Sequence, residues 1–548
     1  MPQTPEQLAI IAAMHDRTAG HIIVDAKAGS GKTTTLLDGV ANMQGETLIL
    51  AFNRSIADEM KLRAGKKLDF LRLAEVQIST VHSHGLKAFA KAGLRAKTLS
   101  GKVQFMLKDE VAKRYSDGDD IHRNLAKVSR LVSAAKGAGF GLDSLHEPFP
   151  AINDRPAWFT LAEHYNLEED LVGDTSLDTI VDLAMKLLVA SNARKNSIDF
   201  DDMIYLPLLF NLPIPQYVNV LIDEAQDINS TRRELAFRSL KPNGRLIAVG
   251  DPNQAIYGFT GADPESLSKI TARAKAKVMP LTVCWRCDAD IIREAQKQVP
   301  TIQPRPNAPA GQVLTIDFEK DDFLSLPREN DAILCRINKP NVAACLGLLR
   351  RGVRAKIEGR DIGKRFEFHA QKACPLYATR SLDDLLLDLE TYKETEIARL
   401  VAKDKAESVI ALLEDEIDAT MLIVERALEQ FAEARTAGRT IEDHNQYSFF
   451  EELLASLFGD DVKNCVVLSS VHKAKGREWK RVFILGYKDW MPHRMAKMPW
   501  EQEQEQNLIY VAKTRAEKIL VYVNGAQSAI DRGLHREKPK DKAGDADC

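Results

Sequence analysis

The sequence contains the stretch Asp25-Ala26-Lys27-Ala28-Gly29-Ser30-Gly31-Lys32-Thr33-Thr34, which lies between the apolar run Ile22-Ile23-Val24 and a segment that can begin a helix. A strand, a glycine-rich turn and a helix in this order are typical of a phosphate-binding loop. Backbone N–H groups of such a turn bind phosphates, Lys32 adds a positive charge, and the Thr33 hydroxyl can be a Mg²⁺ ligand. The stretch therefore predicts a nucleoside triphosphate site. Because Ala26 stands where the strict pattern has glycine, a chance glycine-rich loop is the alternative.

Two adjacent carboxylates follow another apolar run, in Val220-Leu221-Ile222-Asp223-Glu224-Ala225-Gln226-Asp227. Parallel strands of one sheet end at the same edge, so these side chains are expected beside the phosphate loop. Asp223 would hold Mg²⁺, and Glu224 would accept a proton from the attacking water. The alternative is a polar strand end followed by a capped helix. Together with the phosphate loop, the pair favours an ATPase site.

The next apolar run leads into Val249-Gly250-Asp251-Pro252-Asn253-Gln254-Ala255-Ile256-Tyr257-Gly258-Phe259. Gln254 could respond to the γ-phosphate, and Tyr257 and Phe259 could stack on bases. Aromatic residues alone are more often part of a hydrophobic core. A nucleic-acid contact and a core position therefore both stay open for this aromatic pair.

Short, uniformly apolar runs predict strands that are buried on both faces of parallel sheets. They are Thr47 to Ala51, Val218 to Ile222 and Arg245 to Val249 in the first half, and Asp331 to Cys335, Val466 to Ser470, Val482 to Leu485 and Ile519 to Val523 in the second. Helical spacing replaces this pattern in two places: Leu177, Ile180, Val181, Ala184, Leu187 and Leu188 in the first half, and Met421, Val424, Leu428 and Phe431 in the second. Two α/β domains, each interrupted by a helical insertion, are therefore predicted.

Two helix starts can also be predicted from the sequence. Thr4-Pro5-Glu6-Gln7 precedes the apolar stretch Leu8 to Ala13, which favours a short helix before the first strand. Ser381 with Asp384 is a predicted N-terminal cap in the second insertion.

The composition limits the class of protein. A chain of 548 residues exceeds one hydrophobic core, and about 150 residues per domain suggests about three or four domains. With 45% hydrophobic and 28% charged residues and no apolar run near the roughly 18 residues of a membrane span, a soluble globular protein is expected. The N-terminal residues lack the pattern of a secretory signal, so we expect a cytoplasmic protein.

Charge and cysteine content add two constraints. The net charge of −3 gives no general attraction for a polyanion, so any nucleic-acid site must be a local groove of basic and aromatic side chains. Of the seven cysteines, only Cys284 and Cys287 have the spacing of a metal or redox site. Zinc would need a second Cys or His pair nearby, and none stands there, so reduced structural thiols are the favoured interpretation.

In order along the chain, these motifs resemble those of the UvrD/Rep family of superfamily 1 helicases, and specifically the 3′-to-5′ branch, superfamily 1A. The likeness covers nearly the whole chain. In the first half it includes Ala26 to Thr34 (motif I), Ala51-Phe52-Asn53-Arg54 (Ia), Ser79-Thr80-Val81-His82-Ser83 (Ib), Asp223 to Asp227 (II), Gly250 to Ala262 (III), and Ile198 to Met203, where the chain re-enters the first motor domain. In the second half it includes Trp285-Arg286 (IV), Ser470 to Glu478 (V) and Leu508 to Ala516 (VI).

The resemblance implies two RecA-like P-loop motor domains, with parallel sheets flanked by helices, that bind ATP and Mg²⁺ in the cleft between them. It gives catalytic roles to Lys32, Glu224, Gln254, Arg286 and Arg515, the two arginines acting as arginine fingers on the transferred phosphoryl group. For Arg286 and Arg515, ordinary surface ion pairs are the alternative. It assigns ATP contacts to Gln7 and Trp285 at adenine, Glu478 near the ribose, and Ala26, Lys27, Ala28, Gly29, Ser30, Gly31, Lys32, Thr33 and Thr34 at the phosphates, with Thr33 and Asp223 as Mg²⁺ ligands.

The resemblance also implies a path for single-stranded nucleic acid over both motor domains. The expected contacts are Phe52, Asn53, Thr80, His82, Tyr257, Phe259, Ser470 and His472. The chain departs from the usual family pattern at Thr260, where Arg is common, at Trp285, where Tyr is common, and at Arg477, where Leu is common. These departures affect individual contacts, not the expected activity.

The domain boundaries follow from the motifs and the two helical stretches. Motor domain 1A is expected in residues 1–84 and 199–280, helical insertion 1B in 85–198, motor domain 2A in 281–357 and 463–530, a short helical insertion 2B in 358–462, and a disordered tail in 531–548. We expect no appended nuclease domain after motif VI.

Three functions compete on these residues. The chain is expected to be an ATP-dependent 3′-to-5′ DNA helicase, a translocase that displaces proteins without much unwinding, or a nucleotide-dependent scaffold. The scaffold is least favoured, because every residue expected to act in phosphoryl transfer is present. The expected partners are single-stranded DNA, duplex with a 3′ single-stranded tail and a loading protein, for a chain that is monomeric. Stacking contacts tolerate both DNA and RNA, so the sequence leaves that choice open.

Overall fold

The computed structural model describes residues 3–116, 120–168, 171, 173–258, 261–358, 360–374, 381–402, 407–437, 446–458 and 464–532. The chain forms two compact units. Unit 1 comprises Met1–Trp285 and Thr301–Gln303, and unit 2 comprises Arg286–Pro300 and Pro304–Cys548. Short strands β9 (Val283–Cys284) and β10 (Gln303–Pro304) lie where the chain passes between the units. Within the described ranges, every helix is too short or too polar to span a lipid bilayer.

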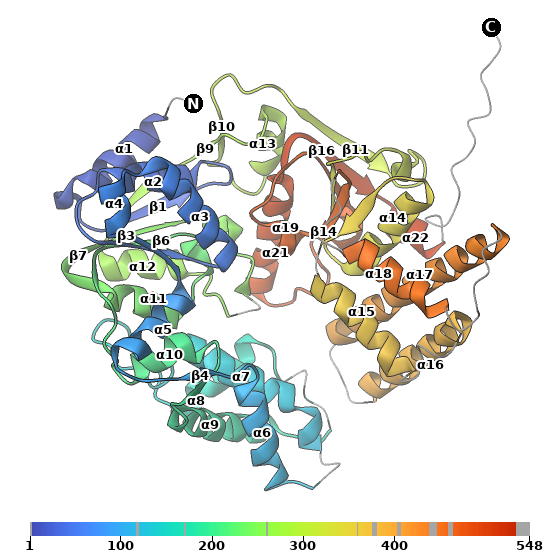
Figure 1. The fold of residues 1–548 in the computed structure, drawn as a ribbon, viewed down its shortest axis with the longest axis horizontal. Helices are drawn as coiled ribbons and strands as arrows, with labels where there is room; N and C mark the ends of the chain where they lie inside the picture. Colours follow the sequence, from blue (N-terminus) through green and yellow to red (C-terminus); the bar gives the residue numbers. More distant parts are fainter. Residues whose placement is uncertain are drawn as a thin grey trace. The chain divides into compact units, whose positions relative to one another are not determined.

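Unit 1 is built on a six-stranded sheet in the order β3-β2-β6-β7-β1-β8, with every ladder parallel (Figure 1). Successive side chains of a strand point to opposite faces, so Ile23 packs into one core while Ile22 and Val24 pack into the other. Both faces are therefore covered, as the apolar runs predict. The strands are β1 (Ile22–Ala26), β2 (Thr47–Ala51), β3 (Val76–Thr80), β6 (Tyr217–Ile222), β7 (Leu240–Gly250) and β8 (Lys277–Leu281).

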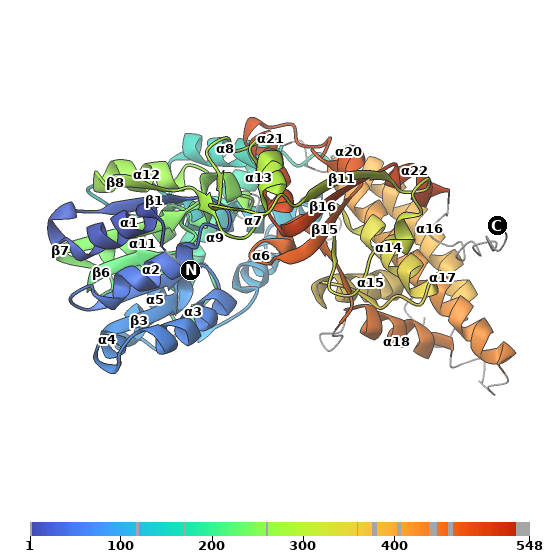
Figure 2. The same ribbon diagram turned by 90° about the horizontal axis from the view of Figure 1, so that it is seen from above.

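The helices of unit 1 surround this sheet (Figures 1 and 2). The first helix begins at a capping box, in which the Thr4 side chain accepts from the Gln7 N–H and the Gln7 side chain accepts from the Thr4 N–H. The predicted short helix before β1 is therefore confirmed, with wider bounds. The helices outside the insertion are α1 (Pro5–His15), α2 (Lys32–Ala41), α3 (Arg54–Lys67), α4 (Phe70–Glu75), α5 (Val81–Lys91), α10 (Asp202–Leu209), α11 (Ser230–Arg238) and α12 (Ser266–Ala274).

The insertion of unit 1 is mainly helical and shares one hydrophobic core with the sheet. Two buried lysines fix it to the segment that re-enters the sheet: Lys102 Nζ lies 2.7 Å from Asp202 Oδ2, and Lys136 Nζ lies 2.7 Å from both Asp199 and Asp202. A two-residue parallel ladder, not expected from the sequence, closes the base. The elements are β4 (Lys97–Thr98), α6 (Lys102–Ala112), α7 (Leu125–Ala138), α8 (Arg155–His164), α9 (Leu177–Ala193) and β5 (Ser197–Ile198).

Unit 2 has its own six-stranded parallel sheet, in the order β11-β16-β15-β12-β14-β13. All four strands predicted in this half are present. The strands are β11 (Gln312–Asp317), β12 (Ala332–Cys335), β13 (Ala355–Ile357), β14 (Val466–Ser470), β15 (Trp479–Leu485) and β16 (Ala516–Asn524), and the helices outside the insertion are α13 (Ala289–Ala295), α14 (Asn338–Arg350), α19 (Val471–Ala474), α20 (Tyr487–Trp490), α21 (Pro499–Lys513) and α22 (Ala526–Asp531).

The insertion of unit 2 consists of α15 (Arg360–Ala373), α16 (Leu382–Val401), α17 (Glu407–Thr436) and α18 (Gln446–Phe458). Ser381 caps α16 by accepting from the Asp384 N–H at 3.1 Å, which confirms the predicted cap. The Asp415 carboxylate of α17 accepts from the backbone N–H groups of Asn338 and Lys339, at 3.0 and 2.8 Å. An acidic side chain of the insertion therefore caps α14, a helix of the sheet domain.

The predicted fold class is confirmed: each unit is an α/β domain with a parallel sheet, flanking helices and a mainly helical insertion. The predicted tail begins at Asp531, which ends α22, and residues 533–548 lie outside the described residues.

Candidate functional site

The turn between β1 and α2 provides an open helix N-terminus. Gly29 has φ +66° and Gly31 has φ +82°, a left-handed conformation that glycine adopts without strain. Among the described residues, no side chain caps α2, so the N–H groups of its first turn can bind an anion. A Cβ at Gly31 would lie 3.2 Å from Gln7 Nε2, so the predicted adenine contact lies against this turn.

Gln7 is buried, and both ends of its amide are bonded. Its Oε1 accepts from the Thr4 N–H, and its Nε2 donates to Thr35 Oγ1 at 3.2 Å. Trp285, the other predicted adenine contact, is held by its backbone, since its N–H donates to the Gly29 carbonyl at 2.8 Å. Both residues are therefore anchored to the phosphate loop or its helix.

Lys32 lies among carboxylates at the start of α2. Its Nζ is 3.0 Å from Glu224 Oε1 and 3.1 Å from Glu224 Oε2. Burial alone would lower the pKa of Lys32, but the negative charges of Glu224, Asp223 and Asp251 outweigh burial and raise it. The structure thus brings together the predicted phosphate-binding lysine and the predicted catalytic base, which stand far apart in the sequence.

Asp223 and Glu224 follow β6 at the same edge of the sheet. Burial, followed by the neighbouring Glu224 charge, raises the pKa of Asp223 to about 7. Glu224 has φ +53°, a left-handed conformation unusual for a residue with a side chain. This turn directs the Glu224 carboxylate to Lys32 while Asp223 stays 3% exposed.

The donor set fits a Mg²⁺ ion that also binds phosphate. Asp223 Oδ1 and Ser30 Oγ are buried and have no hydrogen-bond partner among the described residues. A hard cation would satisfy such an oxygen, and Mg²⁺ uses one or two carboxylates together with phosphate oxygens and waters. No group of three or more acidic, His or Cys side chains forms a metal cluster in the described ranges. The Asp223 carboxylate and the Thr33 hydroxyl at the phosphate loop match this sparse type of site.

A chain of amide contacts connects this site with the segment after β7. Gln226 Nε2 donates to Glu224 Oε2 at 2.6 Å, and Gln226 Oε1 accepts from the Asp251 N–H at 3.1 Å. Asp251 Oδ2 accepts from Gln254 Nε2 at 2.7 Å. The predicted γ-phosphate contact Gln254 is therefore joined to the predicted catalytic base Glu224 through two buried residues, Asp251 and Gln226. Gln226 was not singled out from the sequence, and only its place in Asp223 to Asp227 pointed to it.

Aromatic side chains gather beside this segment. The rings of Phe52 and Tyr257 stack with centroids 5.8 Å apart and an interplanar angle of 13°, and the Arg232 guanidinium lies 5.6 Å from the Phe52 centroid. His82 meets the exposed ring of Phe200 edge-on at 5.9 Å. Burial, and then the Arg232 charge, lower the pKa of His82 to about 4, so this imidazole is neutral at pH 7. Phe259 and Thr260 lie outside the described residues.

In unit 1, two residues that the sequence assigned to nucleic-acid contacts also cap helices, and two residues beside the predicted contacts were not assigned. Asn53 Oδ1 accepts from the Ile56 N–H, and Thr80 Oγ1 accepts from the Ser83 N–H. The Asn53 amide therefore caps the N-terminus of α3, and the Thr80 hydroxyl caps that of α5. Arg232, which lies over Phe52, and Phe200, which meets His82, were not assigned from the sequence.

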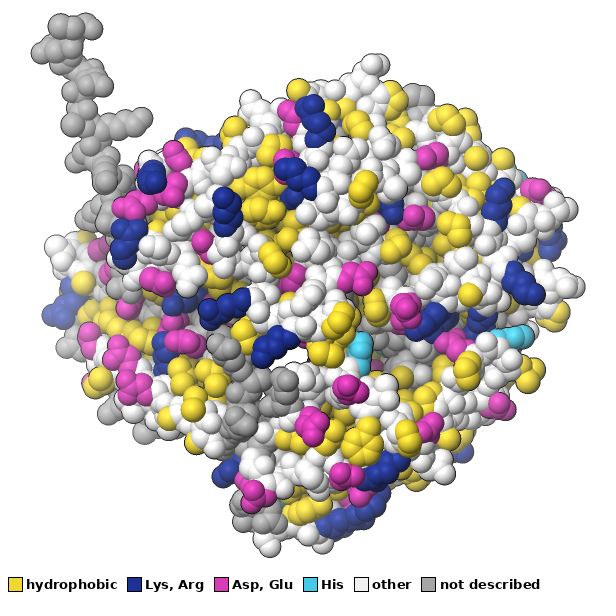
Figure 3. All heavy atoms as spheres, turned by 180° about the vertical axis from the view of Figure 1, so that it is seen from behind, with side chains coloured by type: hydrophobic (Ala, Val, Ile, Leu, Met, Phe, Trp, Pro, Cys, Tyr) yellow, Lys and Arg dark blue, Asp and Glu magenta, His cyan; other side chains and the backbone are white. Residues whose placement is uncertain are grey.

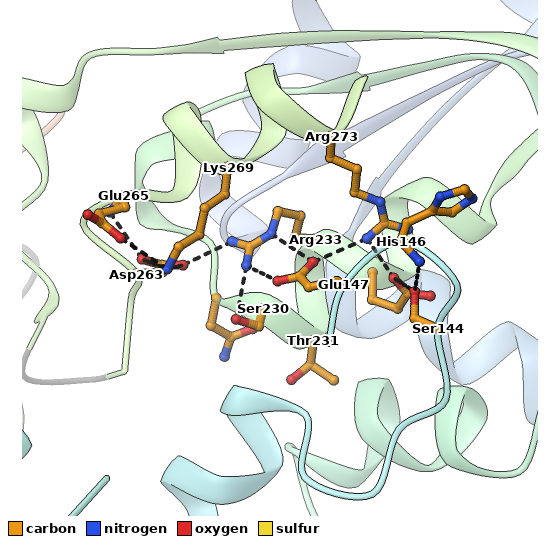
Figure 4. Close-up of polar contacts among 12 residues, drawn as sticks. Ser144, His146, Glu147, Ser230, Thr231, Arg233, Asp263, Glu265, Lys269 and Arg273 are labelled. Atoms are coloured by element: carbon orange, nitrogen blue, oxygen red, sulfur yellow. Dashed lines mark hydrogen bonds and ion pairs between the residues drawn. The ribbon is translucent and has the colours of Figure 1, made fainter. Parts of the chain in front are cut away.

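A buried ion network holds the helix after the carboxylates (Figure 4). Arg233 of α11 is 1% exposed and bonds Glu147, in the loop after α7, and Asp263, at 3.1 Å. Arg273 of α12 bonds the same Glu147 at 3.2 Å and Glu234 at 2.6 Å. The insertion, α11 and the segment that carries Tyr257 are therefore fixed to one another by paired charges.

The predicted residues of unit 2 form two smaller groups. Arg286 Nε lies 2.5 Å from Glu478 Oε2, and its Nη1 donates to the Thr514 carbonyl at 3.1 Å. Arg515 is 1% exposed and donates to the carbonyls of Val511 and Arg477, each at 3.0 Å. Arg286 and Glu478, expected at phosphate and ribose, are thus paired with each other.

Ser470 and His472 lie at the start of α19. Ser470 Oγ accepts from the Lys473 N–H, and burial, with the charges of Arg336 and Lys475, lowers the pKa of His472 to about 3. His472 is therefore neutral at pH 7, like His82 in unit 1. The face in Figure 3 shows Lys and Arg side chains mixed with Asp and Glu, without a continuous patch of one sign.

The sequence is similar to two families of domains and to several known proteins. The UvrD/REP helicase N-terminal domain matches residues 4–275, and the UvrD-like helicase C-terminal domain matches residues 405–524. The ATP-dependent DNA helicase UvrD2 of Mycobacterium tuberculosis is 24% identical over 581 aligned residues, which cover 95% of this chain and 78% of that protein. The ATP-dependent DNA helicase Rep of Buchnera aphidicola is 27% identical over 51% of this chain, and Rep of Escherichia coli 27% over 50%. The chain spans only 42% and 40% of the lengths of these two Rep proteins.

Proposed function

The chain belongs to the UvrD/Rep helicase family, a family of ATP-dependent DNA helicases, and we propose that it is itself a 3′-to-5′ single-stranded DNA translocase and helicase driven by ATP hydrolysis. The observation that carries the proposal is the contact of Lys32 with Glu224 at an uncapped helix N-terminus, beside the buried Asp223. A glycine turn, a lysine and two carboxylates are the parts that ATP hydrolysis requires.

In this proposal the residues of unit 1 divide the chemistry. The glycine turn and Lys32 bind the phosphates, and Thr33 and Asp223 hold Mg²⁺, which neutralises phosphate charge when bound. Glu224 orients the attacking water and accepts its proton. Gln254 contacts the γ-phosphate and is linked to Glu224 through Asp251 and Gln226. Gln7, Trp285 and Glu478 contact the rest of the nucleotide, and Arg286 and Arg515 of unit 2 stabilise the charge of the transferred phosphoryl group.

The strand-binding residues come from both units. Phe52 and Tyr257 of unit 1, with Phe259, stack on bases, while Asn53, Thr80 and His82 contact the strand beside them. Ser470 and His472 of unit 2 grip the backbone through neutral groups. ATP binding and hydrolysis alternate the grip of the two units, which moves the strand in steps. The proposed substrates are single-stranded DNA and duplex with a 3′ tail, in replication, repair or recombination, and the proposed location is with the cell's DNA.

The direction of movement is inferred from the segment after Gln254. In the branch of opposite polarity this segment typically continues into a proline-containing stretch, whereas here Gln254-Ala255-Ile256-Tyr257-Gly258-Phe259 supplies aromatics that can insert between bases. The Phe52 and Tyr257 stack supports such a role. A translocase that displaces proteins without separating much duplex is the second candidate. A monomer, loaded by a protein partner, is proposed for either.

The test is unwinding of duplexes with a 3′ tail, a 5′ tail or blunt ends, with ATP and Mg²⁺ and with Lys32→Ala as the inactive control. Strand separation is expected on the 3′-tailed duplex only. Preferential opening of the 5′-tailed duplex would overturn the direction. ATP-driven displacement of streptavidin from a 3′-tailed strand without strand separation would favour the translocase. ATPase rates with single-stranded DNA and with RNA show which nucleic acid stimulates the enzyme.

A further inference from the structure

A cavity of about 560 Å³ lies in unit 1 between the helical insertion and α11. Its walls come from α6, from α7, from Tyr165 after α8, and from the N-terminal end of α11, where Asn229 and Arg232 stand. The volume is within the range of small-molecule sites, roughly 300–1,000 Å³. No residue assigned to ATP lines it, so the ATP site leaves this cavity unexplained.

The polar groups of the cavity favour an anion. Lys108, Arg130 and Arg232 line it, against the single carboxylate of Asp201, which accepts from the Ser133 hydroxyl. Arg232 Nε is buried without a hydrogen-bond partner among the described residues. Arg232 stands in the first turn of α11, and its own N–H donates to the capping side chain of Asn229 at 3.0 Å, so the guanidinium provides the positive charge at this place.

Another part of the lining suits a flat aromatic group. The Arg130 guanidinium lies 4.9 Å from the ring centroid of Tyr165, and both residues line the cavity. Ser129 Oγ, on the same helix as Arg130, is buried and lacks a hydrogen-bond partner in the part of the chain that the structure describes. A nucleobase could stack on such a surface and bond a hydroxyl. One cavity thus combines a phosphate-binding end with a base-binding wall.

Arg232 also connects the cavity with the aromatic stack. Its guanidinium lies over Phe52, which stacks on Tyr257, and Gly261, only a few residues beyond Tyr257, lines the cavity. A Cβ at Gly261 would lie 3.4 Å from the Tyr165 hydroxyl, and φ of +90° at this position further favours glycine. The backbone beyond the aromatic segment therefore approaches Tyr165 closely.

We propose that this cavity binds one nucleotide unit of the single strand, with its phosphate at Arg232 and its base against Tyr165 and Arg130. The proposal rests on the proposed function, since the strand must already lie on Phe52 and Tyr257. It extends the strand site into the helical insertion, which gives the insertion a direct part in holding the substrate.

The test uses the full chain and a fluorescently labelled oligothymidylate, with binding measured by anisotropy at several salt concentrations. Arg232→Gln removes the charge at the proposed phosphate, and Ala134→Phe fills the cavity from α7. Each variant is expected to weaken binding about tenfold, and Arg232→Gln is expected to reduce the magnitude of the slope of log affinity against log salt by about 0.7. The matched control is Lys97→Gln, which neutralises an exposed lysine of the same insertion outside the cavity and is expected to bind as wild type.

A second measurement locates the base directly. An oligothymidylate with one photoreactive 4-thiothymidine is expected to crosslink to the peptide that contains Tyr165, and Ala134→Phe is expected to abolish this crosslink. Normal binding by both cavity variants, with no crosslink at Tyr165, would overturn the cavity as a strand site. Binding of free thymidine monophosphate that Ala134→Phe abolishes, with strand binding unchanged, would overturn it in favour of a free nucleotide. If wild type does not bind the oligothymidylate at all, the proposed helicase function itself fails.

Discussion

Each of the two units has a parallel six-stranded sheet and a helical insertion, yet the helices that follow strands β1 and β12 begin differently. In unit 1, α2 follows β1 through two left-handed glycines, and no side chain caps it among the described residues. In unit 2, α14 follows β12, and the carboxylate of Asp415 bonds its first N–H groups at 3.0 and 2.8 Å. A carboxylate of the protein thus occupies in unit 2 the kind of position that in unit 1 can bind a phosphate.

Two parallel sheets of the same type can thus carry helix ends with different occupants. The helix N-terminus favours an anion in both units, because its N–H groups are unpaired in the helix. In unit 2 the insertion supplies a carboxylate at that position, whereas in unit 1 the Glu224 carboxylate pairs with Lys32 and leaves the helix end uncapped by any described side chain. The occupant of the helix end therefore distinguishes the unit with the predicted phosphate loop from the unit whose corresponding helix is closed by Asp415.

The largest effect is expected when Lys32 of unit 1 is replaced. Lys32→Ala is expected to abolish ATP turnover by removing the charge that binds the phosphates, while Glu224→Gln is expected to keep ATP binding and lose hydrolysis. Phosphate release and binding of a fluorescent ATP analogue measure the two effects, with Lys66→Ala, an exposed lysine of α3, as the control. Equal loss of ATP affinity in both variants would contradict the separate roles.

The proposed role of unit 2 is tested by removing Arg286 and Arg515 separately. Arg286→Ala is expected to lower turnover by about a thousandfold or more with ATP binding mostly kept, as for other arginine fingers. Arg515→Ala is expected to act alike and also to lower the unfolding temperature, because its guanidinium is buried against backbone carbonyls. Arg293→Ala, an exposed arginine of α13, is the control. Near-normal turnover in either variant would remove that arginine from the reaction.

Because the Asp415 carboxylate that caps α14 is buried, the free energy of unfolding is expected to depend on pH. Burial raises the pKa of Asp415 to about 7, although the N–H groups of Lys339 and Asn338 oppose the rise. Asp415 binds its proton more tightly in the folded state, where its pKa is about 7, than in the unfolded state, where its pKa is near 4. This preference stabilises the fold fully below about pH 4, and the stabilisation is lost as the pH rises through about 7. The stability advantage of wild type over Asp415→Asn is therefore expected to shrink by about 1.4 kcal/mol per pH unit in that window. Urea unfolding of both proteins across this pH range measures it, and an advantage that grows with pH would contradict the assignment.

The smallest expected effect concerns the aromatic stack of unit 1. Tyr257→Ala, and separately Phe259→Ala, should weaken single-strand binding by about 1–3 kcal/mol if each ring stacks on a base. Basal ATPase should survive while its stimulation by DNA falls. Variants that unfold at a lower temperature but bind DNA normally would instead place these rings in the core.

Sequence patterns predicted the central strands because burial on both faces leaves uniformly apolar runs, as in Thr47 to Ala51. Edge strands carry no such signal. Neither β11, with exposed Leu314, nor β8, which contains Pro280, has a continuous apolar run, and neither was predicted. The three-residue β13 is too short for any pattern.

The site was predictable where function fixes the residue type and its spacing along the chain, as for Lys32, Asp223 and Glu224. The contacts among distant residues were not. Nothing in the sequence pairs Gln226 with Asp251, Arg286 with Glu478, or Asp415 with α14, because each pair joins segments that only the fold brings together. The cavity beside Tyr165 likewise depends on where the insertion packs.

The left-handed backbone conformation of Glu224 lowers the stability of the fold at a position where we propose a role in ATP hydrolysis for the side chain. A residue with a side chain is strained there by roughly 1–2 kcal/mol, and glycine would relieve that strain. In the function proposed above, Glu224→Gly would remove this strain, but it would also remove the proposed catalytic base and the carboxylate that bonds Lys32 and Gln226. On that proposal, turnover keeps the glutamate in place at a cost in backbone strain.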